Sequence, residues 1–361
     1  MVNFVNEVNE SNETGTVPGI TRPPEADGAD GAAAGGTAPA REVWLPLPPG
    51  SVDGLPGSLT YHYWNGEEDY PADPADCAFY VPPYGKGAEV AVRPLPLMTG
   101  LEVVQTLTAG VDHLASAKGR LPAGVRVHNA RGVHDASTAE LALALTLAAL
   151  RNLPESVRAQ QYGRWRSRVD PALADSTVVI VGYGAIGEAV ERRLLPFEVA
   201  AVHRVARRAR NAPLGPVRPV ADLGQLLPDA DVVILTTPLT EETRGLVDAG
   251  FLARMKDGAL LVNVARGGVV DTKALLAEVG SPASAPGAED GVPGRLRAAL
   301  DVTDPEPLPA EHPLWRIPGV LITPHVGGNT AAFAPRAERL LRAQLRRWVA
   351  GEQLENAVAV A

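Results

Sequence analysis

Residues 177–187 read TVVIVGYGAIG, a short apolar run that leads directly into three spaced glycines. The run has the length and composition of a buried β-strand, and a helical pattern over residues 188–195 follows the last glycine. In such a strand–turn–helix, Gly182 permits the tight turn, Gly184 lets the backbone approach a pyrophosphate, and Gly187 lets the helix pack closely on the strand. The stretch therefore predicts a dinucleotide site with the phosphates at a helix N-terminus.

The strand pattern continues on the C-terminal side of these glycines. Apolar runs of strand length, separated mostly by helical segments, occur at residues 199–203, 231–235, 259–264, 296–300 and 320–322. Runs that are apolar on both faces and alternate with helices indicate a parallel, doubly wound sheet. A low-complexity loop at residues 280–294 joins a helix at 272–279 to the next strand, so we expect it at the amino ends of the strands.

The N-terminal part of the chain predicts a second, smaller sheet. Short apolar runs lie at residues 43–45, 59–63, 77–81, 103–107 and 125–127, and a long helical pattern covers 137–152, with Asp135, Ser137 and Thr138 as N-cap candidates. We therefore predict an α/β protein of two domains. One domain is predicted to comprise residues 41–136 and 330–361, and a Rossmann doubly wound domain is inserted between them at 137–329. Residues 1–40, rich in Gly, Ala, Glu, Asn and Pro, are predicted to be a disordered tail.

Composition excludes several classes of protein. The net charge of 33 − 42 = −9 argues against nucleic-acid binding as a main activity. No apolar run reaches the length of a membrane span, and the N-terminus does not resemble a secretory signal. The single cysteine, Cys77, excludes an internal disulfide and a multi-cysteine metal site. We expect a cytoplasmic protein with no metal and no membrane or nucleic-acid partner.

The end of the second strand of the dinucleotide unit bears on cofactor choice. NAD enzymes usually carry Asp or Glu there for the ribose 2′-hydroxyl, but here the chain places His203, Arg204 and Arg207 in a stretch with no acid. A guanidinium favours a 2′-phosphate, so we predict that NADP(H) is preferred and NAD(H) possible. A solvated basic loop with ordinary NAD binding is the alternative.

Three motifs besides the glycine loop identify a family. They are TAGVDHL at residues 108–114, NVARGGVVD at 263–271, and DVTDPEP at 301–307 followed by TPH at 323–325. With them the sequence resembles the D-isomer-specific 2-hydroxyacid dehydrogenases, which include glyoxylate/hydroxypyruvate reductases and phosphoglycerate dehydrogenases, from about residue 43 to 354. The resemblance implies that Arg266, Glu306 and His325 are the catalytic residues.

These residue types suit the reduction of a 2-oxo acid. Arg266 can bind the carboxylate and the carbonyl through its planar fork of donors. A histidine such as His325 can donate a proton while hydride arrives from a nicotinamide, and Glu306 would orient the imidazole and stabilise its charged form. Each of the three follows a predicted strand, where open α/β sheets bind ligands.

The resemblance implies further contacts and a partner. Cofactor contacts are expected at Gly182, Gly184, Ala185, Ile186, Gly187, His203, Arg204, Arg207, Thr237, Pro238, Thr243, Val264, Ala265, Asp301 (through the nicotinamide carboxamide) and Gly328. Substrate contacts are expected at Tyr84, Ala109, Gly110, Val111, His134 and Arg266. The domain of residues 41–136 and 330–361 is expected to be a flavodoxin-like substrate domain, and a homodimer through the cofactor domain is also expected. The sequence departs from the family pattern at the missing ribose acid, at Arg131, where many relatives have proline, and in the 280–294 insertion.

Two other functions are compatible with this fold. A dinucleotide-sensing or co-repressor protein would bind cofactor without turnover, although retention of the three catalytic residues argues against it. An oxidative dehydrogenase acting on formate or phosphite is the other. The substrate side chain is not specified by the sequence.

Overall fold

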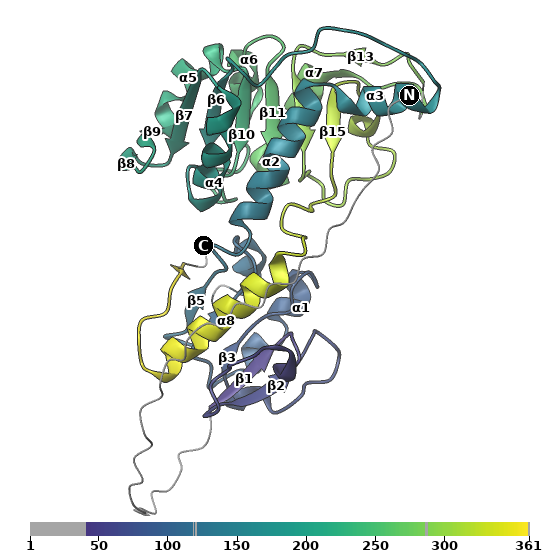
Figure 1. Ribbon diagram of the computed structural model, residues 1–361. Helices are drawn as coiled ribbons and strands as arrows, with labels where there is room; N and C mark the ends of the chain where they lie inside the picture. The colour runs from purple at the N-terminus through teal and green to yellow at the C-terminus, as the bar shows by residue number, and fades with distance from the viewer. Residues whose placement is uncertain (1–40, 118, 120, 286–287, 360–361) are drawn as a thin grey trace, which may run out of the picture. The chain divides into compact units, whose positions relative to one another are not determined.

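A computed structural model describes residues 41–117, 119, 121–285 and 288–359 (Figure 1). The predicted tail at residues 1–40 lies outside the described residues. Two sheets of six and eight strands dominate the described part of the chain, and most of their pairings are parallel. The fold is the predicted α/β fold of two domains, while the residue boundaries of those domains remain a prediction.

The first sheet has the flavodoxin strand order. Its parallel strands follow one another as β2-β1-β3-β4-β5, and β16 pairs antiparallel with β5 at one edge. Their bounds are Glu42–Leu45 (β1), Thr60–Tyr63 (β2), Cys77–Tyr80 (β3), Val103–Gln105 (β4), Arg126–His128 (β5) and Ala357–Val358 (β16). All five predicted strands are present with slightly different ends, and β16 is too short to show a sequence pattern.

The second sheet has the Rossmann order. Its parallel strands run β9-β7-β6-β10-β11-β14-β15, with β8 antiparallel on β9 at the edge. Their bounds are Thr177–Val181 (β6), Ala201–Ala206 (β7), Arg210–Ala212 (β8), Gly215–Pro219 (β9), Val232–Leu235 (β10), Leu260–Asn263 (β11), Arg297–Leu300 (β14) and Val320–Ile322 (β15). The strand order reverses between β6 and β10, which makes this edge the switch point where such sheets bind ligands.

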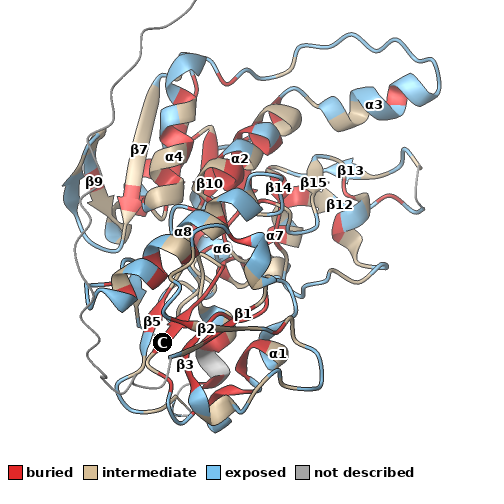
Figure 2. Cartoon of the chain, turned by 60° about the horizontal axis from the view of Figure 1, so that its bottom comes forward, coloured by how far each residue is buried: buried red, intermediate tan, exposed pale blue. Residues whose placement is uncertain are grey.

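Helices cover both sheets. They are Ala88–Val92 (α1), Asp135–Leu150 (α2), Leu153–Gln161 (α3), Ala185–Leu194 (α4), Leu223–Leu226 (α5), Ala249–Arg254 (α6), Thr272–Val279 (α7) and Phe333–Val349 (α8). Figure 2 shows the buried residues gathered along β10 and on one side of α2 and α4. Val178 and Ile180 of β6 share a core with Ala142 of α2 and Val190 of α4. The glycine turn at the end of β6 is therefore held on a rigid base.

Helix α8 packs on the first sheet. Ala337, Leu341, Leu345 and Trp348 recur at helical spacing and share one core with Phe79 of β3. The rings of Phe79 and Trp348 lie 5.2 Å apart between centroids. The apolar face of this helix therefore joins the C-terminal part of the chain to strands formed near its beginning.

Two sequence predictions about element ends are wrong. Helix α2 begins at Asp135, and its N-cap is His134, which makes no side-chain capping bond. The predicted cap residues lie inside the first turn, where Ser137 donates to the His134 carbonyl at 3.1 Å. Strand β7 extends to Ala206 instead of ending at residue 203. The reason is that its pairing with β6 continues to the pair formed by Val181 of β6 and Val205 of β7. Arg204 is thus a strand residue, and the β8–β9 hairpin that follows was not predicted.

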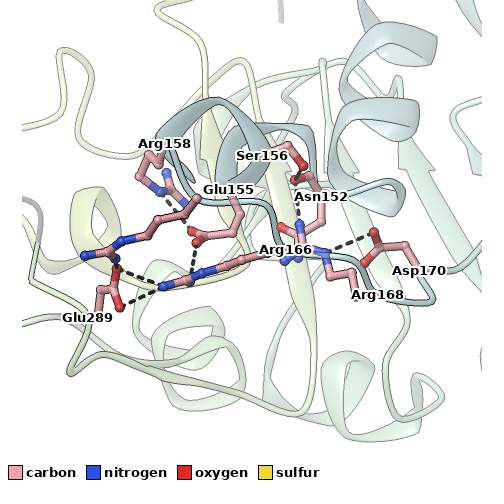
Figure 3. Close-up of polar contacts among 9 residues, drawn as sticks. Asn152, Glu155, Ser156, Arg158, Arg166, Arg168, Asp170 and Glu289 are labelled. Atoms are coloured by element: carbon pink, nitrogen blue, oxygen red, sulfur yellow. Dashed lines mark hydrogen bonds and ion pairs between the residues drawn. The ribbon is translucent and has the colours of Figure 1, made fainter. Parts of the chain in front are cut away.

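The insertion lies at the amino end of β14, as predicted, and forms a small ribbon. Strands β12 (Gly280–Ser281) and β13 (Val292–Pro293) pair antiparallel within it. Glu289 pairs with Arg166 at 3.2 Å and also with Arg164, both in the segment between α3 and β6 (Figure 3). The insertion is therefore bound to an exposed part of the chain away from the carboxyl ends of the strands.

Candidate active site

The glycine turn forms a cradle at the switch point of the second sheet. Gly182 has φ +99°, and a Cβ there would lie 2.5 Å from the backbone nitrogen of Thr237. The amides of Gly182 and Tyr183 both donate to the Val205 carbonyl at 2.9 Å. Beside Gly184 the nearest atom to an added Cβ is 4.0 Å away, so the backbone is accessible on that side. This geometry fits the close approach of a pyrophosphate.

Helix α4 begins within the glycine motif, three residues earlier than predicted. Gly184 is its N-cap, and Ala185, Ile186 and Gly187 form its first turn. Amides in the first turn of a helix have no partner within the helix. The Gly184 amide donates to the Gly182 carbonyl at 2.7 Å, so the amides that can receive an anion are those of Ala185, Ile186 and Gly187.

The other predicted cofactor residues follow the neighbouring strands. After β10, Thr237 donates to the Val181 carbonyl at 3.0 Å, and Thr243 donates to the Pro238 carbonyl at 2.6 Å, which closes that loop. After β11, Val264 and Ala265 are buried. These residues share the carboxyl edge of the sheet, and their contacts with a cofactor remain a prediction.

Glu306 and His325 form an ion pair. They follow the adjacent strands β14 and β15, and His325 Nδ1 lies 2.5 Å from Glu306 Oε1. The hydrogen bond to Glu306 raises the pKa of His325, against the opposing effects of burial and of the Arg266 charge. The same bond lowers the pKa of Glu306, and Arg266 lowers it further. About half of each side chain is accessible, so solvent weakens the coupling.

Buried Asp301 positions the loop that carries His325. Its carboxylate accepts from the Thr323 hydroxyl at 2.6 Å and from the amides of Val326 and Gly327, each at 2.9 Å. His325 adopts φ +52°, a conformation uncommon for a residue with a side chain, and its amide donates to the Asp301 carbonyl at 2.8 Å. Strain of this kind persists where the surroundings enforce it, typically at functional sites. Asp301, predicted to contact the nicotinamide carboxamide, uses most of its acceptor capacity within the protein.

Arg266 is held by groups from both sides of the site. Its Nε donates to Asp112 at 3.2 Å, and its Nη1 donates to the Ala265 carbonyl at 2.8 Å. A Cβ on Gly110 would collide with the Arg266 guanidinium, so only glycine fits there. The backbone of Arg266 is fixed by buried Asn263, whose amide donates to the Arg266 carbonyl at 3.0 Å. The sequence motifs contain Asp112 and Asn263 but give neither a role, because each acts through Arg266.

Comparisons with known proteins agree with this geometry. The sequence model of the D-isomer specific 2-hydroxyacid dehydrogenase NAD binding domain matches residues 143–327. The chain belongs to this family. It is 37% identical over 239 residues to the mouse (Mus musculus) glyoxylate reductase/hydroxypyruvate reductase. The aligned part covers 64% of this chain and 68% of the relative.

Solved structures of the family match most of the chain. A D-isomer specific 2-hydroxyacid dehydrogenase from Xanthobacter autotrophicus, in complex with NADPH and MES, is 29% identical with a TM-score of 0.72, covering 90% of this chain and 99% of that one. An NADPH-dependent glyoxylate/hydroxypyruvate reductase from Sinorhizobium meliloti, in complex with NADP and malonate, is 25% identical with a TM-score of 0.69, covering 89% and 97%. The protein is therefore an NAD(P)-dependent oxidoreductase of this family.

In this dehydrogenase the three residues predicted to contact the ribose end of the cofactor differ in their surroundings. Burial, with the charges of Arg218 and Arg204, lowers the pKa of His203. Arg204, predicted to contact the cofactor, forms two hydrogen bonds with the buried carboxylate of Glu191, and its contact with a cofactor remains a prediction. Arg207 is 72% exposed and lies 3.6 Å from Glu242. Arg207 is therefore the more available cation of the two.

The substrate-loop residues of the dehydrogenase form a stacked group. The ring of Tyr84 lies 4.3 Å from that of Phe333 and 5.8 Å from that of His134, between centroids. A Cβ on Gly328 would lie 2.7 Å from His134 Nδ1, so this glycine allows the two loops to approach. Burial raises the pKa of Tyr84, and the charge of Arg266 opposes the rise. Tyr84 and His134 thus lie together, close enough to Arg266 to feel its charge, and their contacts with a substrate remain a prediction.

The loop at residues 109–111 of the dehydrogenase is tied down through its carbonyls. Asn129 donates to the Ala109 carbonyl and the Thr108 hydroxyl donates to the Gly110 carbonyl, each at 2.7 Å. Among the residues that the structure describes, no acceptor is bound to the amides of Ala109, Gly110 or Val111. These amides are therefore available to an acceptor, and their predicted contact with a substrate carboxylate remains a prediction.

Neither a membrane span nor a metal cluster is found in the described ranges. No helix there has both the length and the apolar character needed to cross a bilayer. Within the same ranges, no three His, Cys, Asp or Glu side chains gather as metal ligands.

Proposed function

We propose that the protein reduces glyoxylate or hydroxypyruvate to the corresponding 2-hydroxy acid, with NADP(H) as the preferred cofactor and NAD(H) as a possible one. The observation that carries the proposal is the His325–Glu306 ion pair at 2.5 Å, close enough to Arg266 for its charge to act on both groups. The relatives named for these two substrates, and those solved with NADPH or NADP, support the choice.

Arg266 would bind the substrate. Its guanidinium has five N–H groups, of which one bonds to Asp112 and one to the Ala265 carbonyl. The remaining donors, on Nη1 and Nη2, can reach a carboxylate oxygen and the neighbouring carbonyl oxygen together. This arrangement holds the 2-oxo acid in one plane and polarises its carbonyl. The amides of Gly110 and Val111 would complete the carboxylate site.

His325 would supply the proton. Because Nδ1 bonds to Glu306, the proton available to the substrate is on Nε2. Bound nicotinamide supplies the hydride that reduces the carbonyl carbon. His325 protonates the carbonyl oxygen as negative charge develops there, and Glu306 stabilises the imidazolium before transfer. Reduction needs protonated His325, so its raised pKa extends activity to higher pH.

The dinucleotide would lie across the switch point. We assign the pyrophosphate to Gly182, Gly184 and the first turn of α4, and the adenosine end to the carboxyl end of β7. There Arg207 is the better candidate for a 2′-phosphate, because Arg204 is bound to Glu191.

The protein is also proposed to form a homodimer through the cofactor domain. The segment after α3 leaves Tyr162, Trp165 and Val169 exposed, Trp165 by 97%. Large apolar side chains grouped in this way typically mark a protein interface. Trp165→Ser should shift the protein towards monomer in sedimentation velocity, whereas Trp315→Ser, at another exposed tryptophan, should not. A wild-type protein that is monomeric at micromolar concentration would disprove the assembly.

A panel of 2-oxo acids assayed with NADPH and NADH tests the proposed reaction. Glyoxylate or hydroxypyruvate should oxidise NADPH with the highest kcat/KM, and His325→Ala should abolish turnover while leaving NADPH binding intact. Stoichiometric NADPH binding without turnover on any 2-oxo acid would indicate a sensing protein. Turnover only with formate or phosphite and oxidised cofactor would indicate an oxidative dehydrogenase.

A further inference from the structure

A buried acid lies beneath the glycine turn. Glu191, on α4, is 1% exposed, and its Oε2 accepts from the Tyr183 hydroxyl at 2.5 Å and from Arg204 Nε at 2.7 Å. Arg204 Nη2 donates to the other carboxylate oxygen, so the pair is bidentate. Tyr183 is the second residue of the glycine motif. One carboxylate thus joins the glycine turn, α4 and β7.

The Arg204 guanidinium is enclosed on several sides. It lies 6.0 Å from the centroid of the Tyr183 ring, and its side chain is only 14% exposed. Gly215, in the β8–β9 hairpin, covers another side, because a Cβ there would lie 2.8 Å from Arg204 Nη1. Arg204 therefore cannot turn towards a ligand without leaving Glu191 buried and unpaired, which is strongly unfavourable.

We propose that Glu191 determines cofactor specificity by holding Arg204 in a neutral buried pair, so that this cation does not bind the ribose 2′-phosphate. The 2′-phosphate is then recognised by cations that Glu191 does not bind. These are Arg207 and Arg208, which are exposed just beyond β7. The inference rests on the proposed dinucleotide site. Glu191 acts through Arg204 and is a positioning residue.

Three variants separate this arrangement from direct phosphate binding by Arg204. Glu191→Gln keeps hydrogen-bonding groups beside Arg204 and Tyr183 but leaves the Arg204 charge uncompensated. Arg204→Gln leaves the negative charge of Glu191 uncompensated. The double variant removes both charges and keeps two amides of similar shape. The measurement is the Kd of NADPH and of NADH for each protein, by quenching of tryptophan fluorescence.

The ratio of the two Kd values should change in opposite directions in the single variants. The preference for NADPH should rise about five- to tenfold in Glu191→Gln and fall by a similar factor in Arg204→Gln, since one charge is added or removed near the phosphate. Both changes should shrink in high salt. The double variant should keep the wild-type ratio to within about twofold, because distant phosphate ligands are unaffected. Arg207→Gln, as the comparison, should lose the preference.

The outcomes distinguish the two hypotheses. An equal loss of NADPH preference in Arg204→Gln and in the double variant would show that Arg204 binds the phosphate directly, and an unchanged ratio in Glu191→Gln would also overturn the inference. If the single variants do not fold, the double variant alone tests the inference. Loss of the NADPH preference in the double variant would refute the proposed role of the Glu191–Arg204 pair, and a retained preference would support it. A wild-type protein that binds neither nucleotide would refute the proposed function itself.

Discussion

Replacing Arg266 measures how much substrate binding depends on its planar fork. The guanidinium uses one N–H on Asp112 and one on the Ala265 carbonyl, which leaves donors on Nη1 and Nη2 for a 2-oxo acid. A hydrogen bond to a charged group contributes roughly 1.5–3 kcal/mol. Arg266→Met removes two such bonds, so kcat/KM should fall by about 10²- to 10⁴-fold. Arg266→Lys keeps the charge and one hydrogen bond, so its kcat/KM should fall by about 10- to 100-fold.

The assay is kcat/KM for glyoxylate at saturating NADPH, with the Kd of NADPH measured separately. The Kd should stay close to the wild-type value, because Arg266 is assigned to the substrate. Asp112→Asn is the matched control. It breaks a partly exposed ion pair, worth about 1 kcal/mol at most, and leaves the fork in place, so it should cost about fivefold or less. Wild-type kcat/KM in Arg266→Lys, or an equal loss of NADPH binding in Arg266→Met, would refute the reasoning.

Three further predictions concern the proton donor, the glycine turn and the insertion. Glu306→Gln removes the charge that raises the pKa of His325, so the alkaline limb of the reduction profile and the acidic limb of the oxidation profile should both move to lower pH; unmoved limbs would contradict the assignment. Gly182→Ala places a Cβ 2.5 Å from the Thr237 nitrogen and should cost about 1–3 kcal/mol of stability and weaken NADPH binding, whereas Gly351→Ala, also at positive φ but with open space around it, should leave NADPH binding unchanged. Replacing residues 281–293 by a short Gly-containing turn should leave kcat and KM within about tenfold of wild type, because the insertion lies at the amino end of β14; a larger loss in a folded variant would show that the insertion reaches the site.

The sequence alone predicted the architecture and singled out the candidate catalytic residues. Apolar runs of strand length predicted both sheets. Those of the second sheet alternate with helices and are apolar on both faces, because helices bury both faces of that sheet. The glycines at 182, 184 and 187 predicted the turn, because a positive φ and a close approach at Gly182 exclude other residues. Arg266, Glu306 and His325 each follow a strand, and parallel pairing of β11, β14 and β15 brings strand ends to one edge. Their proximity followed from the connectivity of the fold.

Only the tertiary structure decided what each charge is paired with. In the sequence Arg204 belongs to a basic stretch without an acid, yet in the fold it bonds to Glu191, thirteen positions earlier on α4. Asp112 reaches Arg266 across 154 positions, and Asp301 fixes the loop that carries His325. The ends of α2 and β7 also differ from the prediction, because pairing and packing override local preference. A local pattern records which face of an element is buried, but a polar partner contributed by a distant segment leaves no periodic trace in the sequence.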